Sequence, residues 1–258
     1  MKRAPDSHKG ENGKIAVVGG SQFIHGAPLM NLLAAEATGV DTLSVCLPAC
    51  HAEVAKQATT NVFVHSFLSD ELTADDAEEI LELLATIDCA VIGSGISRES
   101  PSVKALMTIL GVCSCPLVLD ATALQPKTLE LVRGKNAVLT PHLAELERME
   151  LDASELKAQA GESGVVICLK GPTDRIAGPG GKYEEISGGN AGLTVGGTGD
   201  ALAGLIAGLM AQNIPAFDAT VMGCTIMKRA ATLLYPDKGY AFTTRDVIAL
   251  IPQLLHTY

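Results

Sequence analysis

A cluster of glycines surrounds a single acidic residue late in the chain. The stretch "GNAGLTVGGTGDALAGLIAGLMAQ", residues 189–212, places Gly196, Gly197 and Gly199 just before Asp200 and continues as an apolar segment rich in small residues. Because glycine lacks a Cβ atom, the backbone can approach a ligand closely and direct successive N–H groups at one point. With a helix N-terminus behind them, these groups predict an anion hole for a phosphate or a developing oxyanion.

Asp200 is the candidate general base beside this anion hole. It falls in the first turn of the expected helix, where an acid could also act only as a cap worth ~1 kcal/mol. Capping alone does not require Gly-Gly-Thr-Gly before the acid. We therefore expect Asp200 to deprotonate a hydroxyl group that attacks a terminal phosphoryl group. The sequence contains neither G-x-x-x-x-G-K-[ST] nor G-x-G-x-x-G, the other common phosphate motifs.

Other polar residues and glycines follow directly after apolar runs that are typical of buried strands. In an open parallel sheet, ligands bind outside the carboxyl ends of the strands. Any one glycine at a strand end could simply make a turn, but five such ends together predict one crevice. The residues concerned are Gly19–Gly20–Ser21, Gly93–Ser94–Gly95, Asp120, Pro141–His142 and Lys170–Gly171.

The order of the expected elements is that of an α/β fold. Strands alternate with helical segments, two short strands join in a hairpin across "GPGG", and three helices end the chain, the last with a break near Pro252. This predicts a mostly parallel sheet in a single domain, residues 1–258, of which residues 1–13 are a polar N-terminal extension. The expected strands are 14–20, 42–48, 88–95, 116–122, 136–141 and 164–171, the hairpin is 175–177 with 182–186, and the expected helices include 27–39, 72–87, 197–212, 216–234 and 243–255.

The charge and composition of the chain exclude some classes of binding partner and indicate the cellular compartment. The formal charge of −10 argues against nucleic acid, although backbone N–H groups and a cation can still hold a nucleotide. The seven cysteines are an odd number without repeated C-x-x-C pairs, which predicts reduced thiols in a cytoplasmic protein. The "CSC" at 113–115 has poor chelating spacing, so no metal-ligating residues are predicted. Neither a signal peptide nor a membrane span is expected.

The "GGTGD" segment resembles the anion-hole signature of the ribokinase-like superfamily. Five further segments resemble, in order, one branch of it, the ADP/ATP-dependent NAD(P)H-hydrate dehydratases, and together they span nearly the whole chain. The resemblance implies a ribokinase-like three-layer α/β/α sandwich with a mostly parallel central sheet. The segments are "SHKGENGKIAVVGGSQFIHGAP" (7–28), "VIGSGISR" (91–98), "LVLDATAL" (117–124), "VLTPHLAEL" (138–146) and "VICLKGPTDRIAGPGG" (166–181).

The resemblance also implies a repair reaction. Family members use ADP or ATP to phosphorylate the hydroxyl of hydrated NADH or NADPH, and phosphate then leaves to restore the cofactor. For this chain it implies ADP as the favoured nucleotide with Mg²⁺, a homo-oligomer such as a tetramer, and a separate epimerase in the pathway. Asp200 would take the proton, while Gly197, Thr198 and Gly199 would stabilise charge on the phosphoryl group.

The binding residues are implied by the same resemblance. His142 is expected to donate a hydrogen bond to a phosphate or an amide rather than to transfer the proton. The residues expected to border the AMP part of the nucleotide are Lys170, Gly171, Pro172, Thr173, Asp174 and Gly199. Those expected to line the hydrated-cofactor site are Ala27, Gly95, His142, Asn190 and Asp200.

Four segments depart from the family pattern. "PHLAE", "GSGIS", "LDATAL" and "GNAG" stand where relatives have "PHPGE", "GPGLG", "LDADAL" and "GNPG". The first two changes remove a tight turn and a glycine beside the expected substrate, which leaves open a different substrate preference or a lower activity. Two other functions therefore stay open: a small-molecule kinase of the same superfamily, for a vitamin precursor or a sugar, and a non-catalytic nucleotide-binding protein.

Overall fold

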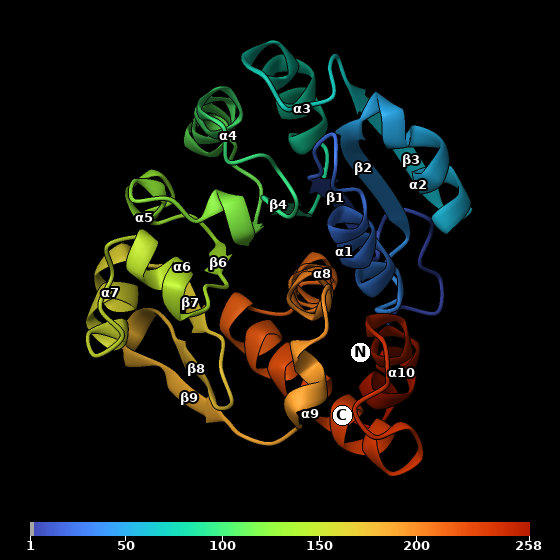
Figure 1. Ribbon diagram of the computed structural model, residues 1–258, viewed down its shortest axis with the longest axis vertical. Helices are drawn as coiled ribbons and strands as arrows, with labels where there is room; N and C mark the ends of the chain where they lie inside the picture. The colour runs from blue at the N-terminus through green and yellow to red at the C-terminus, as the bar shows by residue number, and fades with distance from the viewer. Residues whose placement is uncertain (1–2) are drawn as a thin grey trace.

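A nine-stranded sheet forms the centre of the molecule in the computed structural model, which describes residues 3–258 (Figure 1). The strand order is β3-β2-β1-β4-β5-β6-β7-β8-β9. Neighbours from β3 to β7 pair in parallel, and β8 and β9 add an antiparallel hairpin. The strands are β1 Lys14–Val18, β2 Thr42–Pro48, β3 Val62–Phe67, β4 Cys89–Ile92, β5 Leu117–Leu119, β6 Ala137–Leu139, β7 Val166–Leu169, β8 Asp174–Ala177 and β9 Tyr183–Ile186.

Helices cover both faces of this sheet (Figure 1). Alternate residues of β1 belong to different cores: Ile15 and Val17 pack with α1, α8, α9 and α10, whereas Ala16 and Val18 pack with α3, α4, α6 and α7. This alternation confirms the predicted three layers. The helices are α1 Gly26–Glu36, α2 Ala52–Ala58, α3 Ala77–Leu84, α4 Ser100–Val112, α5 Thr128–Leu131, α6 Leu143–Arg148, α7 Leu156–Ser163, α8 Thr198–Ala211, α9 Ala216–Lys238 and α10 Thr244–His256.

Two features of the sheet and its helices differ from the sequence prediction. Strand β3 was not predicted, because at the sheet edge its residues are only partly buried and its apolar run is interrupted by His65 and Ser66. The predicted break near Pro252 is wrong, since Pro252 lies inside α10. Burial of Ile251, Leu254 and Leu255 holds the last turns of α10 in place despite the missing N–H donor.

Helix α8 packs unusually closely on α1, beside which it runs in Figure 1. A Cβ atom at Gly204 would overlap the carbonyl oxygen of Asn31, and one at Gly208 would overlap the side chain of Thr38. The small residues of α8 therefore let α1 approach its backbone. Asn31, fully buried at this crossing, donates from Nδ2 to the Asp200 carbonyl oxygen at 2.7 Å, so the crossing also fixes the first turn of α8.

Replacing Gly204 with Ala is expected to lower the free energy of unfolding by ~1–3 kcal/mol, because the new methyl group overpacks the crossing. The matched control is Gly161→Ala in α7, where an added Cβ would meet no heavy atom within 4 Å. That change should raise stability by ~0.5–1 kcal/mol, since alanine is the better helix former. Urea denaturation of both variants checks this, and a Gly204→Ala variant as stable as the control would contradict the packing argument.

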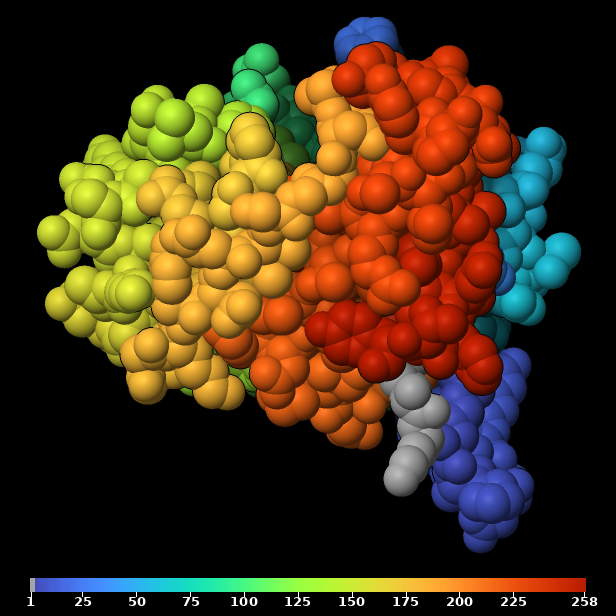
Figure 2. Space-filling view, turned by 90° about the horizontal axis from the view of Figure 1, so that it is seen from below, coloured from blue at the N-terminus to red at the C-terminus, as the bar shows by residue number. Residues whose placement is uncertain are grey.

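Residues 10–12, ahead of β1, are hydrogen-bonded to Asp41 of the same chain. The Asp41 carboxylate accepts hydrogen bonds from the backbone N–H groups of Gly10 and Asn12 at 2.8 Å and 3.0 Å. Figure 2 shows this blue segment projecting beside the red C-terminal helix. Within residues 3–258, no helix is both long enough and apolar enough to cross a bilayer.

Candidate active site

The carboxyl ends of neighbouring parallel strands meet, as predicted, at one edge of the sheet. Short backbone hydrogen bonds tie the segments together there: the Gly20 N–H donates to the Ser94 carbonyl oxygen at 2.9 Å, and the Lys170 N–H donates to the Pro141 carbonyl oxygen at 2.8 Å. Gly93, with φ of +119°, lies so close to the next strand end that a Cβ atom there would overlap the Asp120 carbonyl oxygen. The glycines after β1 and β4 thus allow the backbones of neighbouring strand ends to approach one another closely.

The N-terminus of α8 points into this region. The helix begins at Thr198, one residue after the predicted start at 197, with Gly197 as N-cap at φ of +96° and without a side-chain cap. The first N–H groups of a helix have no intrahelical partner, so those of Gly199 and Asp200 are free to bind an anion. Thr198 is different, because its hydroxyl donates to the Leu193 carbonyl oxygen at 2.7 Å and so stabilises the preceding loop.

Gly199, in the first turn of α8, lies close to the Lys170 ammonium group. A Cβ atom at Gly199 would lie 3.4 Å from Lys170 Nζ and 3.9 Å from Asp120 Oδ2. Any side chain larger than glycine would therefore occupy the space between the helix N–H groups and the lysine. The predicted phosphoryl space is the region in front of these N–H groups and beside the Lys170 ammonium.

Asp200 has the electrostatics of a base. Burial, followed by the charge of Asp120, raises its pKa to about 6, while the neighbouring Ser94 hydroxyl and the Lys170 ammonium act in the opposite direction. Ser94 Oγ is itself buried without a hydrogen-bond partner of ordinary geometry. A carboxylate with this pKa is ionised at neutral pH but more basic than an exposed aspartate, as general-base catalysis requires.

Lys170 sits among carboxylates. Its Nζ lies 2.7 Å from Asp120 Oδ1 and 3.8 Å from Glu145 Oε2. Burial by itself would lower the pKa of Lys170, but these two carboxylates outweigh it, and the net pKa lies above the ordinary value. Asp120 Oδ1 also accepts a hydrogen bond from Thr140 Oγ1 at 2.9 Å. The lysine is therefore charged and held in place beside Gly199.

His142 caps α6 next to Lys170. Its Nδ1 accepts from the Glu145 N–H at 3.3 Å, and Glu145 Oε2 accepts from the His142 N–H at 2.9 Å, forming a capping box. With Nδ1 used as an acceptor, the hydrogen-bond network assigns the ring proton to Nε2. That nitrogen lies 3.5 Å from Glu145 Oε1, and the side chain is about half exposed. His142 Nε2 is therefore a hydrogen-bond donor, and its predicted bond to a phosphate or an amide stays a prediction.

The remaining predicted binding residues fall into two groups. Gly95, at φ of +73°, and Ala27 are adjacent, since a Cβ atom on Gly95 would lie 3.3 Å from Ala27 Cβ. Gly171 and Pro172 are exposed on the loop after β7, and Thr173 bonds Ser187 through the two hydroxyl groups at 2.9 Å. Their contact with a ligand stays a prediction.

Asp174 and Asn190 use their side chains within the protein. Asp174 Oδ1 accepts from the Gly171 N–H at 3.0 Å, and Asn190 donates from Nδ2 to the Ala231 carbonyl oxygen at 2.7 Å. Asn190 Oδ1 accepts from the Gly192 N–H at 2.9 Å. Both residues therefore shape their loops, and any direct part in ligand binding stays a prediction.

Sequence reasoning assigned no role to three residues that contribute to this site. Glu145 lies within "PHLAE", and its spacing from His142 is that of a capping box, a signal that could have been used. Ser94 was seen only as part of a glycine turn. Lys228, on α9, donates from Nζ to the Gly171 and Pro172 carbonyl oxygens of the loop after β7. It gave no signal, because an isolated lysine in a helix is normally a solvated residue.

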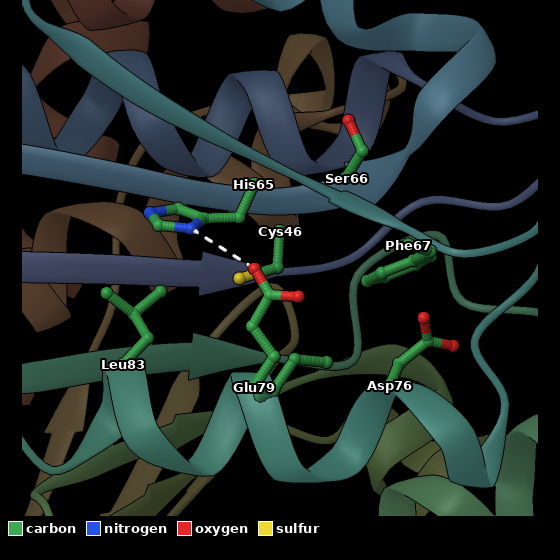
Figure 3. A pocket seen from close by; sticks show the side chains of 8 residues that line it. Cys46, His65, Ser66, Phe67, Asp76, Glu79 and Leu83 are labelled. Atoms are coloured by element: carbon green, nitrogen blue, oxygen red, sulfur yellow. Dashed lines mark ion pairs between the residues drawn. The ribbon is translucent and has the colours of Figure 1, made fainter.

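A separate small pocket lies near the β3 edge (Figure 3). His65 Nδ1 lies 3.9 Å from Glu79 Oε1 there, and burial raises the pKa of the neighbouring Cys46 thiol to about 12. The cavity, of about 10 Å³, has room for about one water molecule. It contains none of the predicted site residues, and the described residues hold no cluster of three or more His, Cys, Asp or Glu suited to a metal ion.

Comparison with known proteins shows the family of this chain. The family model described as NAD(P)H-hydrate dehydratase matches residues 15–253. The chain belongs to this family. It is 33% identical over 267 residues to an ADP-dependent (S)-NAD(P)H-hydrate dehydratase of Cenarchaeum symbiosum, a match that covers 99% of this chain and 93% of the relative.

Two further relatives extend the comparison to structure and to domain organisation. The ADP/ATP-dependent NAD(P)H-hydrate dehydratase of Bacillus subtilis, co-crystallised with ATP/Mg²⁺, superposes with a TM-score of 0.85 at 25% identity and covers 99% of this chain and 93% of that one. The predicted ribokinase-like fold is confirmed. A bifunctional NAD(P)H-hydrate repair enzyme of Methanothermobacter thermautotrophicus is 33% identical over 98% of this chain, which spans 51% of that relative.

Proposed function

We propose that this dehydratase-family protein restores NADH and NADPH from their hydrated forms in a reaction driven by ADP or ATP. The observation that carries the proposal is Asp200, with its raised pKa, at the open N-terminus of α8 and opposite the charged Lys170. Membership of the family and the activity for which its relatives are named support it.

The first step transfers a phosphoryl group. Asp200 accepts the proton of the ring hydroxyl while the hydroxyl oxygen bonds to the terminal phosphorus, and AMP leaves from ADP, or ADP from ATP. The N–H groups of Gly199 and Asp200, together with the Lys170 ammonium, stabilise the charge on the phosphoryl oxygens. His142 donates a hydrogen bond at the edge of the site.

The second step is an elimination. Hydroxide is a poor leaving group, whereas phosphate is a good one. The lone pair of the ring nitrogen expels phosphate as the C–O bond breaks, and loss of a proton from the adjacent ring carbon restores the double bond. Phosphate leaves with the electron pair of the broken bond, so the products are NAD(P)H and inorganic phosphate.

The residues of the site fit a role for Mg²⁺. Asp120 and Glu145 are oxygen donors placed beside the phosphoryl space, and Mg²⁺ is commonly held by one or two carboxylates together with substrate phosphates. When bound, the ion would neutralise charge on the nucleotide phosphates. Asp120 and Glu145 would then hold the cation, and Lys170 would contact the phosphates beside it.

Other properties of the protein follow from the same proposal. ADP is the favoured nucleotide, and the substrates are hydrated NADH and hydrated NADPH (NADHX and NADPHX). The bifunctional relatives extend well beyond the matched region, which supports an NAD(P)H-hydrate epimerase as the partner activity. We also propose that the protein forms a homo-oligomer, such as a tetramer, and that it is located in the cytoplasm.

The proposal is tested with enzymatically hydrated NADH, Mg²⁺ and either ADP or ATP. Recovery of the reduced-nicotinamide absorbance with a nucleotide, and none without one, is expected. No recovery with either nucleotide would contradict the proposal. A small-molecule kinase would instead show nucleotide consumption only with another hydroxyl compound, and a non-catalytic protein would bind nucleotide without turnover.

The rate is expected to depend on pH through Asp200. A general base must be ionised, and the pKa of this carboxyl is about 6 in the free protein, so kcat/KM should be constant near neutral pH and fall about tenfold per pH unit well below 6. An exposed aspartate would keep the rate constant down to about pH 4. A pH profile of kcat/KM makes the comparison, and a profile flat to pH 4.5 would exclude Asp200 as the base in this environment.

A further inference from the structure

A buried lysine of α9 lies behind the nucleotide loop. Lys228 is 6% exposed, and its neighbours on the helix include the buried Cys224, Met227 and Ala231. Its ammonium group is close to three acceptors: the Gly171 carbonyl oxygen at 3.2 Å, the Pro172 carbonyl oxygen at 3.1 Å and Asp174 Oδ2 at 3.1 Å. An ammonium has three protons, so each has an acceptor and the buried charge is compensated.

Asp174 closes the same loop from the other side. One carboxylate oxygen pairs with Lys228, and the other accepts the Gly171 N–H at 3.0 Å. Lys228 thus holds two consecutive carbonyl groups of the loop, while Gly171 and Pro172 themselves remain exposed. A loop held by its carbonyl oxygens leaves its outer surface free for a ligand, in a conformation that the helix fixes.

The same turn of α9 also contacts the loop that leads to the anion hole. Gly189, at φ of +68°, packs against Lys228, since a Cβ atom there would lie 3.3 Å from Lys228 Cα. Asn190 is tied to the Ala231 carbonyl oxygen one turn of backbone later. A cavity of about 250 Å³ lies between the start of this second loop and α9, and its lining includes Ser187, Thr225 and Lys228.

We propose that Lys228 is a positioning residue that fixes the loop 170–174 in its nucleotide-binding conformation and sets its distance from the loop 187–197. The inference rests on the proposed function in one respect, that the loop 170–174 borders the nucleotide. Lys228 does not touch the reacting atoms, because all three of its protons are directed at the protein. Its effect is therefore on nucleotide affinity and not on the chemical step.

The test compares Lys228→Met with Lys228→Arg and with the exposed control Lys104→Met. Methionine has a similar length but donates no hydrogen bond, so AMP and ADP should bind about tenfold more weakly or worse by calorimetry. KM for ADP should rise in parallel, while kcat at saturating ADP and KM for the hydrated cofactor change less than about threefold. Lys228→Arg should recover most of the affinity, and Lys104→Met should match the wild type.

A second variant separates loop positioning from folding. Lys228→Met leaves the Asp174 carboxylate buried without its partner, which alone could unfold the protein. The double variant Lys228→Met with Asp174→Asn removes that charge and should regain thermal stability, but not nucleotide affinity. Wild-type affinity in a folded Lys228→Met protein, or an equal loss of kcat and of affinity for both substrates, would overturn the inference.

The binding measurement keeps this inference distinct from the proposed function. Calorimetry with AMP or ADP needs no hydrated cofactor, so it gives a result even if the dehydratase assay fails. Nucleotide binding that depends on Lys228, without dehydration, would support the inference and refute the proposed function. Absence of nucleotide binding by the wild-type protein would overturn both.

Discussion

Replacing Asp200 with Asn should reduce kcat by about 10²–10⁴-fold, because the amide keeps the shape of the carboxyl group but cannot accept the hydroxyl proton. The first turn of α8 should remain intact, since its N–H groups and the contact of Asn31 with the Asp200 carbonyl oxygen involve only the backbone of this residue. Nucleotide affinity should be retained or improved, because one negative charge is removed beside the phosphates.

The control for this variant is Asp218→Asn. Asp218 occupies the same third position of its helix, α9, and is exposed. The Asp218→Asn change therefore removes the same interaction between a carboxylate and a helix N-terminus, but it does not alter the candidate active site. The two variants are compared by their stopped-flow and steady-state rates and by their affinity for AMP, measured by calorimetry. Rates in Asp200→Asn within threefold of the wild type would remove Asp200 from the mechanism.

Replacing Lys170 with Met should have the second largest effect, a loss of about 10²–10³ in kcat, as expected when one charge-stabilising donor is removed. It should also shift the pH dependence. The Lys170 ammonium lowers the pKa of Asp200, so without it the acid limb of the kcat/KM profile should move from about pH 6 to higher pH. The two readouts together distinguish an electrostatic role from a general loss of structure.

Stability must be controlled in this variant, since Asp120 loses its partner at 2.7 Å. The pair Lys170→Met with Asp120→Asn removes the unpaired charge and should restore the midpoint of thermal unfolding but not kcat. An acid limb that stays near pH 6 in folded Lys170→Met would show that Lys170 does not act on Asp200.

Much of the crevice was predictable because strand ends leave a local signal. Glycine, Asp120, His142 and Lys170 each follow a short apolar run, and parallel pairing brings such positions to one edge of the sheet. The glycines before Asp200 also leave a local signal. They predicted the anion hole because exposed backbone N–H groups depend on the conformation of a single segment. The helix then began at Thr198, a small difference in boundary.

What could not be predicted depends on contacts between distant segments. Nothing in "IMKRAAT" indicates that Lys228 reaches back to the loop after β7, 57 residues earlier in the chain. The roles of Gly204 and Asn31 arise only when α1 and α8 cross. The raised pKa of Asp200 likewise depends on burial and on the charge of Asp120, which is supplied by another strand end.

The most direct test of the account is the stoichiometry of one reaction. Wild-type protein, hydrated NADH, Mg²⁺ and ADP are mixed, and reduced-nicotinamide absorbance, AMP and inorganic phosphate are followed in the same sample. The account predicts one AMP and one inorganic phosphate for each nicotinamide restored, since phosphate is transferred and then eliminated. AMP formation accompanied by a stable phosphorylated product, without free phosphate or recovered absorbance, would contradict it.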